Sequence, residues 1–273
     1  MRVFILAVIL NTLAFFTLKA SEPIQAQDSN LVRLNNFISQ ILKETPQQSD
    51  SIIAISNFLI NISKESTMQA YVARSLFDRL YNSNELEYEA AAHYIAKNYF
   101  INEKLTPFSK EDLNFIKVWV EFTNENLVGM KAPNLRMESI KGDTINLSDL
   151  SPRYTLIYFY DDQCSICKAT TPSLIELLNS YRILKLNLIA IYVESSKESW
   201  KNYIESTLSK LKKPKKWIHM WDPQIESNYQ KSWGVLGVPK IYLLNKDGVI
   251  IGKNFDIPSL SKYLKEIEQN AKR

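Results

Sequence analysis

The segment Tyr158-Phe-Tyr-Asp-Asp-Gln-Cys-Ser-Ile-Cys-Lys-Ala-Thr-Thr-Pro172 holds the only two cysteines of the 273-residue chain. An apolar, β-rich run over residues 154–160 precedes Cys164, and a helical pattern follows to about Leu184. A Cys-x-x-Cys pair between a strand and a helix is a redox signature, because unpaired N–H groups and the helix dipole stabilise a thiolate there. Cys167, one turn further in and less exposed, can then attack a mixed disulfide formed at Cys164.

Other uses of the cysteine pair fit the sequence less well. A structural zinc site takes about four ligands, and besides the cysteines the chain offers only His93 and His219, which lie in different regions. A disulfide across so few residues removes little chain entropy and stabilises a fold weakly. A buried, inert pair is the remaining alternative. The pattern predicts a redox-active disulfide between Cys164 and Cys167, with no metal and no cofactor.

The carboxy-terminal half alternates between strand and helix patterns. The expected strands are 135–140, 144–147, 154–160, 186–193, 216–221, 240–244 and 249–253, and the expected helices are 164–184, 197–208 and 258–269. This order predicts an α/β unit, in which helices cover a central mixed sheet.

Three further motifs connect this half to a known family. Lys168 and Pro172 follow the cysteines, Gly234-Val-Leu-Gly-Val-Pro239 precedes an apolar strand, and residues 131–150 form an opening hairpin pattern. Over residues 130–270 the chain resembles secreted TlpA/ResA-like thiol-disulfide oxidoreductases, which have a thioredoxin-like fold and an AhpC/TSA-type opening hairpin. The resemblance implies a cis Pro239 that faces the cysteines. It also implies that Val238 presents its backbone to an extended substrate peptide.

The active-site segment departs from the thioredoxin pattern at several positions. Tyr158 stands where thioredoxins carry a buried carboxylate, so proton transfer at Cys167 must be assisted from elsewhere or by water. Gln163 replaces a tryptophan, and Ser165-Ile166 replaces Gly-Pro. The charges of Asp161 and Asp162 would oppose thiolate formation at Cys164. We therefore hypothesise that the couple acts as a reductant.

The first residues have the pattern of a secretory signal peptide. A positive Met1-Arg2 is followed by a mostly apolar run over residues 3–18 and then by small polar residues. This run is shorter than the roughly 20 residues of a membrane-spanning helix. We expect residues 1–26 to be removed, with cleavage between 20 and 26. The mature protein would have no stable membrane span and would be periplasmic, as in Gram-negative bacteria.

Residues 27–128 have helical periodicity and predict a small all-α domain in front of the thioredoxin-like domain at 129–273. Helical patterns cover 31–42, 52–62, 68–80, 85–98 and 113–122. Asp50 is expected to cap the second of these helices, and Ser109-Lys-Glu-Asp112 has the form of a capping box for the last. No arrangement of polar residues in this half indicates catalysis.

These observations predict an enzyme that exchanges disulfides in exported proteins. Its partners would be cysteine-containing exported proteins and an upstream thiol electron donor. The net charge of +4, or +3 without residues 1–26, is too small to indicate a nucleic-acid partner. A second hypothesis is that the helical domain is a protein- or ligand-binding module with a redox-sensitive accessory domain. A thiol peroxidase fits less well, because Ile157 and Asp161 stand where peroxidases have Pro and Thr.

Overall fold

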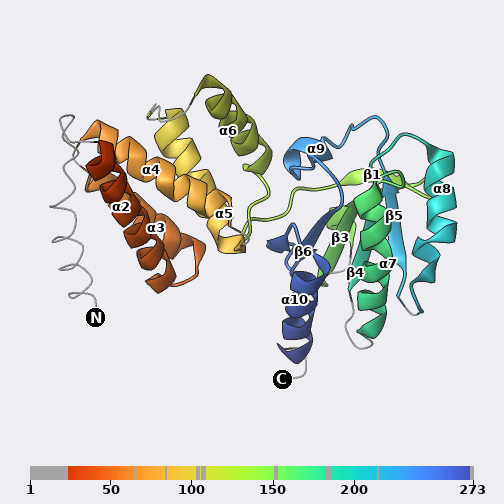
Figure 1. Cartoon of the computed structure of the whole chain (residues 1–273). Coiled ribbons are helices and arrows are strands. Elements are labelled where there is room, and N and C mark those ends of the chain that lie inside the picture. Colours follow the sequence, from red (N-terminus) through yellow and green to blue (C-terminus); the bar gives the residue numbers. More distant parts are fainter. Residues whose placement is uncertain are drawn as a thin grey trace. The chain divides into compact units, whose positions relative to one another are not determined.

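The computed structural model describes residues 24–63, 65–83, 85–102, 105, 109–150, 153–181, 186–213 and 215–270. The chain divides into two compact units, residues 1–114 and 115–273 (Figure 1). Most of the predicted signal peptide, residues 1–23, lies outside the described residues. Among the helices described, none combines the length and the apolar character needed to cross a membrane. The predicted domain boundary at residue 128 stays a prediction.

The amino-terminal unit is helical, as its periodicity predicts. Its elements are α2 (Ile24–Glu44), α3 (Ser49–Asn61), α4 (Ser66–Tyr81), α5 (Leu86–Ile95), the π-helix η1 (Ala96–Asn102) and the start of α6 (Lys110–Thr123). Each long helix buries one apolar stripe. In α2 the stripe consists of Leu34, Ile38, Ile41 and Leu42, which recur at the spacing of one helix face.

The structure tests the helix caps and helix ends that we predicted from the sequence. The prediction for Asp50 is wrong: α3 begins at Ser49 after Gln48, which makes no side-chain cap, and Asp50 lies inside the first turn. There its charge still interacts favourably with the helix dipole. The capping box is confirmed, because Ser109 Oγ accepts from the Asp112 N–H at 3.1 Å and an Asp112 carboxylate oxygen accepts from the Ser109 N–H at 3.4 Å. The helix expected over 85–98 changes to π-helix at Ala96.

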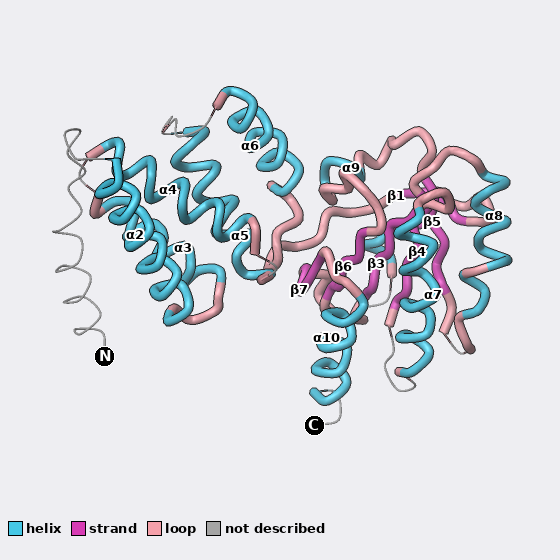
Figure 2. Tube along the Cα trace, in the orientation of Figure 1, coloured by secondary structure: helices cyan, strands magenta, loops and turns pink. Residues whose placement is uncertain are grey.

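The described part of the carboxy-terminal unit contains a seven-stranded mixed sheet of order β2-β1-β5-β4-β3-β6-β7 (Figure 2). The strands are β1 (Arg136–Ser139), β2 (Thr144–Asn146), β3 (Thr155–Tyr160), β4 (Asn187–Tyr192), β5 (Trp217–Trp221), β6 (Lys240–Leu244) and β7 (Ile250–Lys253). The three strands β3, β4 and β5 are parallel, and the other pairs are antiparallel. The α/β prediction is therefore confirmed.

Alternation along β3 assigns its side chains to two faces, because successive residues of a strand point in opposite directions. Ile157 and Phe159 lie in an apolar cluster on one face. Tyr158 and Tyr160 point to the other face, toward the helices that follow β3 and β4. These helices are α7 (Ser165–Ser180) and α8 (Lys197–Ser206), and the carboxy-terminal α10 (Ile257–Asn270) packs beside α7.

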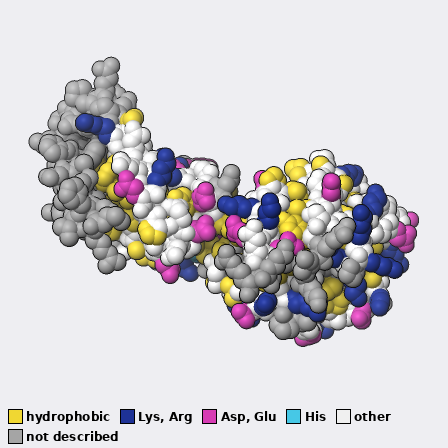
Figure 3. Space-filling view, turned by 90° about the horizontal axis from the view of Figure 1, so that it is seen from below, with side chains coloured by type: hydrophobic (Ala, Val, Ile, Leu, Met, Phe, Trp, Pro, Cys, Tyr) yellow, Lys and Arg dark blue, Asp and Glu magenta, His cyan; other side chains and the backbone are white. Residues whose placement is uncertain are grey.

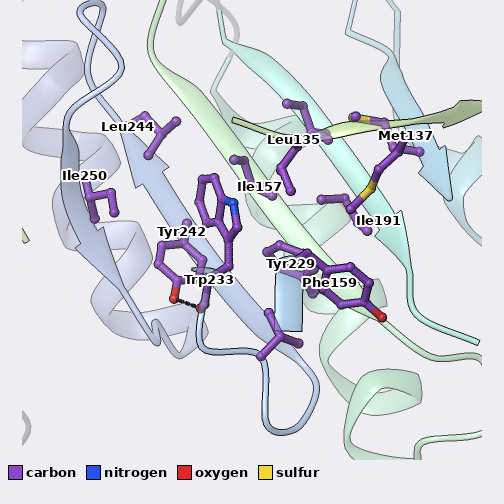
Figure 4. Close-up of a cluster of buried hydrophobic side chains, with 13 residues drawn as sticks. Leu135, Met137, Ile157, Phe159, Ile191, Tyr229, Trp233, Tyr242, Leu244 and Ile250 are labelled. Carbon is purple, nitrogen blue, oxygen red and sulfur yellow. Dashed lines mark hydrogen bonds between the residues drawn. The ribbon is translucent and has the colours of Figure 1, made fainter. Parts of the chain in front are cut away.

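The apolar cluster is centred on aromatic rings (Figure 4). Trp233 meets Tyr242 edge to face, with centroids 4.9 Å apart and an interplanar angle of 88°. Phe159 stacks on Tyr229 with a centroid distance of 5.8 Å. The Tyr242 hydroxyl donates to the carbonyl of Trp233. These contacts hold α9 (Tyr229–Ser232) and the turn after it against the sheet, directly before the loop of residues 234–239.

A buried lysine ties the segment after α6 to the same turn. Lys253 is 1% exposed, and its Nζ donates to the backbone oxygen of Asn126 at 3.0 Å and to its side-chain oxygen at 2.6 Å. The Asn126 amide nitrogen donates to the carbonyl of Ser232 at 3.0 Å and to that of Phe122 at 2.7 Å. A buried ammonium is tolerated here because strong acceptors surround it.

Candidate active site

Cys164 lies between β3 and α7 as the N-cap residue of the helix. Its φ of −65° and ψ of 120° are extended, so the helix begins at Ser165. The sulfur accepts a hydrogen bond from the backbone N–H of Cys167 at 3.2 Å. It thereby satisfies one of the N–H groups that a helix start leaves unpaired. This is the position that the strand and helix patterns predict.

The loop before β6 brings a second part of the chain to Cys164. The Val238–Pro239 peptide bond is cis, as the family resemblance implies. The Cys164 thiol donates to the carbonyl oxygen of Val238 at 3.4 Å, a typical distance for a weak sulfur hydrogen bond. All four site residues expected from the sequence therefore lie in one place. Their roles in the reaction stay predictions.

The two thiols differ sharply in exposure. Both cysteines are free, but Cys164 is partly exposed whereas Cys167 is fully buried. Burial raises the pKa of the Cys167 thiol to about 12, although a backbone hydrogen bond from Asp161 acts in the opposite direction. An incoming disulfide can therefore reach only the first sulfur from solvent, and the second can react only with a partner already joined to Cys164.

The two aspartates before Cys164 are held by hydrogen bonds. Asp162 is buried, and its carboxylate accepts from the Tyr192 hydroxyl at 2.5 Å and from the Gln163 amide at 2.6 Å. Asp161 accepts from the Gln163 backbone N–H at 2.7 Å. Both carboxylates thus keep fixed places next to the cysteines. The expected effect of their charges on the Cys164 thiol stays a prediction.

A cluster of three hydroxyl groups, two of them buried, is bonded to the backbone of Cys167. Thr171 Oγ1 donates to the Cys167 carbonyl at 2.8 Å and accepts from the Tyr203 hydroxyl at 2.9 Å. The Tyr158 hydroxyl lies 2.7 Å from the same oxygen. Thr171 follows Cys167 by four residues, the spacing at which a threonine hydroxyl bonds back to a helix carbonyl, so its place could have been predicted. Nothing in the sequence indicated that Tyr203 of α8 would join it.

The histidines do not form a metal site with the cysteines. Among the residues described, no group of three or more His, Cys, Asp or Glu side chains could hold a metal ion. His219 lies on β5, where burial lowers its pKa to about 4, and His93 is buried in α5. The reactive groups that the fold brings together here are two thiols of unequal exposure.

Comparison with known proteins shows what this arrangement is similar to. Residues 152–250 match the model of a family described as thioredoxin-like. The thiol-disulfide oxidoreductase ResA of Bacillus thuringiensis subsp. konkukian is 25% identical over 153 residues, which cover 54% of this chain and 83% of that relative. ResA of Bacillus cereus is 24% identical over 145 residues, which cover 51% and 78%.

A solved structure extends the similarity of fold to the helical half. A thioredoxin-like protein from Bacteroides caccae superposes with a TM-score of 0.57 at 20% identity, covering 88% of this chain and 82% of that one. The protein thus has a thioredoxin-like fold preceded by helices, as expected. Its curated relatives are thiol-disulfide oxidoreductases of the ResA type, which confirms the resemblance seen in the sequence.

Proposed function

We propose that this protein is a thiol-disulfide oxidoreductase that exchanges disulfides in exported proteins through Cys164 and Cys167. The observation that carries the proposal is the pairing of a partly exposed Cys164 at a helix N-terminus with a buried Cys167 one turn below it. The sulfur of Cys164 accepts the Cys167 N–H at 3.2 Å, so the two residues already occupy adjacent places. The thioredoxin-like match and the ResA relatives support the same chemistry.

The reaction follows from this order of exposure. The Cys164 thiolate attacks one sulfur of a substrate disulfide, forms a mixed disulfide and releases the other substrate sulfur as a thiolate. Cys167 then loses its proton and attacks the Cys164 sulfur, which forms the Cys164–Cys167 disulfide and releases the second substrate thiolate. Two electrons pass from the protein to the substrate, and the released thiolates take up two protons. An upstream thiol donor must reduce the protein again.

Val238 and Pro239 are proposed to position the substrate. The Val238 carbonyl is 3.4 Å from the reacting sulfur, so a peptide bound along this loop would bring its own cysteine to Cys164. Two large apolar side chains near the site are exposed, Ile166 at 62% and Leu236 at 65%. They offer apolar surface to residues that flank the substrate cysteine.

We further propose that the couple is a reductant in the periplasm. This proposal rests on the place of the Asp161 and Asp162 carboxylates, which hydrogen bonds hold in the loop directly before Cys164. A reduction potential near the thioredoxin value of about −270 mV would agree, whereas one near about −120 mV would indicate an oxidant. A complete Cys164 thiolate absorbance already at about pH 5 would contradict the effect of the aspartates.

Reduction of insulin tests the enzymatic proposal. The pre-reduced protein should reduce insulin disulfides, and Cys164→Ser should abolish this activity. A matched Ser165→Ala variant, one residue away and exposed, should retain it. Full activity of Cys164→Ser would overturn the assignment. Export is tested separately by sequencing the amino terminus of protein from a periplasmic fraction, which should begin between residues 21 and 27.

A further inference from the structure

The reaction requires the buried Cys167 to lose a proton, and the surrounding hydroxyl groups limit how it can do so. Thr171 has one hydroxyl proton, which it donates to the Cys167 carbonyl at 2.8 Å. Tyr203 donates to the Thr171 oxygen at 2.9 Å, so Tyr158, at 2.7 Å from that oxygen, must donate as well. The Thr171 oxygen therefore accepts hydrogen bonds from both tyrosine hydroxyls. Its own hydroxyl bonds to the Cys167 carbonyl and so fixes the helical turn that carries Cys167.

None of these hydroxyls is a base near neutral pH. Burial raises the pKa of Tyr158 and that of Tyr203 above the ordinary value of a phenol, so both remain protonated. Tyr158 and Thr171 are fully buried, and the hydrogen bonds of the cluster end at the Cys167 carbonyl, not at a carboxylate. The cluster can hold the resolving residue in place, but it cannot accept its proton.

Other titratable groups surround the thiol. The groups that interact with it are Cys164 and Asp161 in the preceding loop, Tyr158 on β3 and Tyr203 on α8, and Asp162 follows Asp161 in the same loop. Both oxygens of the Asp162 carboxylate already accept hydrogen bonds. Asp161 accepts from Gln163, and its charge raises the pKa of Cys167. Among these groups, Asp161 therefore remains as a candidate base for the Cys167 proton. An experiment must test whether it has this role.

We propose that the Tyr158–Thr171–Tyr203 cluster positions Cys167 without acting as its base, so that solvent hydroxide removes the proton when the mixed disulfide is resolved. Hydroxide takes the Cys167 proton and becomes water, the thiolate attacks the Cys164 sulfur, and the substrate thiolate leaves. Thr171 is a positioning residue in this step. This inference rests on the proposed function and adds the way its second step is controlled.

The second step can be followed with dithiobis(nitrobenzoate), an aromatic disulfide that releases one coloured thionitrobenzoate at each step. The first release reports attack by Cys164, and the second reports resolution by Cys167. We expect the second rate to rise about tenfold per pH unit from about pH 6 to pH 9 without a plateau, because the thiolate fraction follows hydroxide. A rate that is independent of pH in this range would overturn the inference.

Variants separate positioning from proton transfer. Thr171→Val should slow the second release at least tenfold and leave the first within about twofold, with the same slope against pH. Thr171→Ser, which keeps the hydroxyl, should restore the second rate. Asp161→Asn should change it by less than about threefold. A tenfold loss in Asp161→Asn would identify Asp161 as the base and overturn the inference, as would a normal second rate in Thr171→Val.

A substitution that adds a base gives the converse test. Tyr158→Asp should accelerate the second release at least tenfold at about pH 6 and make its rate less dependent on pH. If this variant does not fold, the inference is still tested by the pH profile of the wild type and by the comparison of Thr171→Val with Thr171→Ser. Failure of the proposed function has a different signature: the second release would be absent, or it would persist unchanged in Cys167→Ser.

Discussion

The thiol of Cys164 lies 3.4 Å from the carbonyl oxygen of Val238, a residue 74 positions later in the chain. The antiparallel pairing of β3 with β6 accounts for this contact, because Cys164 follows the end of β3 and Val238 precedes the start of β6. The sheet therefore brings the Cys164 sulfur and the loop of residues 234–239 together at one edge. Basic and acidic side chains both occur on the face of this unit seen in Figure 3.

Cys167→Ser is expected to trap substrates. The serine hydroxyl cannot attack the mixed disulfide, so covalent adducts of Cys164 should accumulate from a trace to most of the protein. Electrophoresis without reductant and peptide mass analysis would measure them. A Cys164→Ser/Cys167→Ser double variant is the control and should form no adduct. Equal trapping by wild type and Cys167→Ser would contradict a resolving role.

Gly234→Ala should destabilise the protein by about 2 kcal/mol or more. Gly234 has a φ of +58°, and a Cβ there would lie 2.5 Å from the Phe122 carbonyl oxygen, so the substitution meets both backbone strain and a clash. Gly237→Ala, three residues later, has open space around the added Cβ and should stay within about 0.5 kcal/mol of wild type. Urea unfolding of both variants tests the difference, and equal stabilities would refute the prediction.

Lys253→Met should cost about 2–3 kcal/mol of unfolding free energy. The substitution keeps the apolar stem but leaves the backbone and side-chain oxygens of Asn126 without the ammonium donor that lies 3.0 and 2.6 Å away. The exposed Lys246→Met is the matched control, expected within about 0.5 kcal/mol. Thermal or urea unfolding measures both. A Lys253→Met variant as stable as wild type would contradict the prediction.

Stability should fall between about pH 6.5 and pH 4 because of His219. Burial lowers its folded-state pKa to about 4, and among the described residues its buried Nδ1 has no hydrogen-bond partner. The unfolded chain therefore binds a proton first as the pH falls, which favours unfolding. The contribution is complete above about pH 6.5 and is lost toward pH 4, with about 1–2 kcal/mol gone at pH 5.

Urea titrations at pH 7 and pH 5 measure this loss. His219→Asn should reduce the difference between the two pH values, because asparagine cannot gain a proton. The comparison is made within each variant, so a lower stability of His219→Asn at pH 7 does not affect it. An unchanged pH dependence in His219→Asn would assign the effect to other groups.

Local rules within the sequence were enough for much of the fold. The apolar, β-rich run over residues 154–160 and the helical pattern after it placed Cys164 at a helix start, and Ser109 with Asp112 predicted a capping box. Such rules act within one strand or one helical turn, where the spacing of residues alone fixes which groups meet. The same rules failed at Asp50, because the Gln48 carbonyl already accepts a helical hydrogen bond from the Ile52 N–H at 3.0 Å, so the helix begins before Asp50.

The surroundings of the two thiols depend on how distant elements pack in the folded protein. From the sequence alone we could predict the cysteine pair at a helix start and the α/β class, and the order in which the two cysteines react stays a prediction. The sequence did not determine that Tyr203 and Tyr158 would meet on Thr171, or that Lys253 would bind Asn126, 127 positions away. These contacts join side chains from different elements. Their existence depends on the order of the strands and the packing of helices on them, which no local spacing of residues encodes.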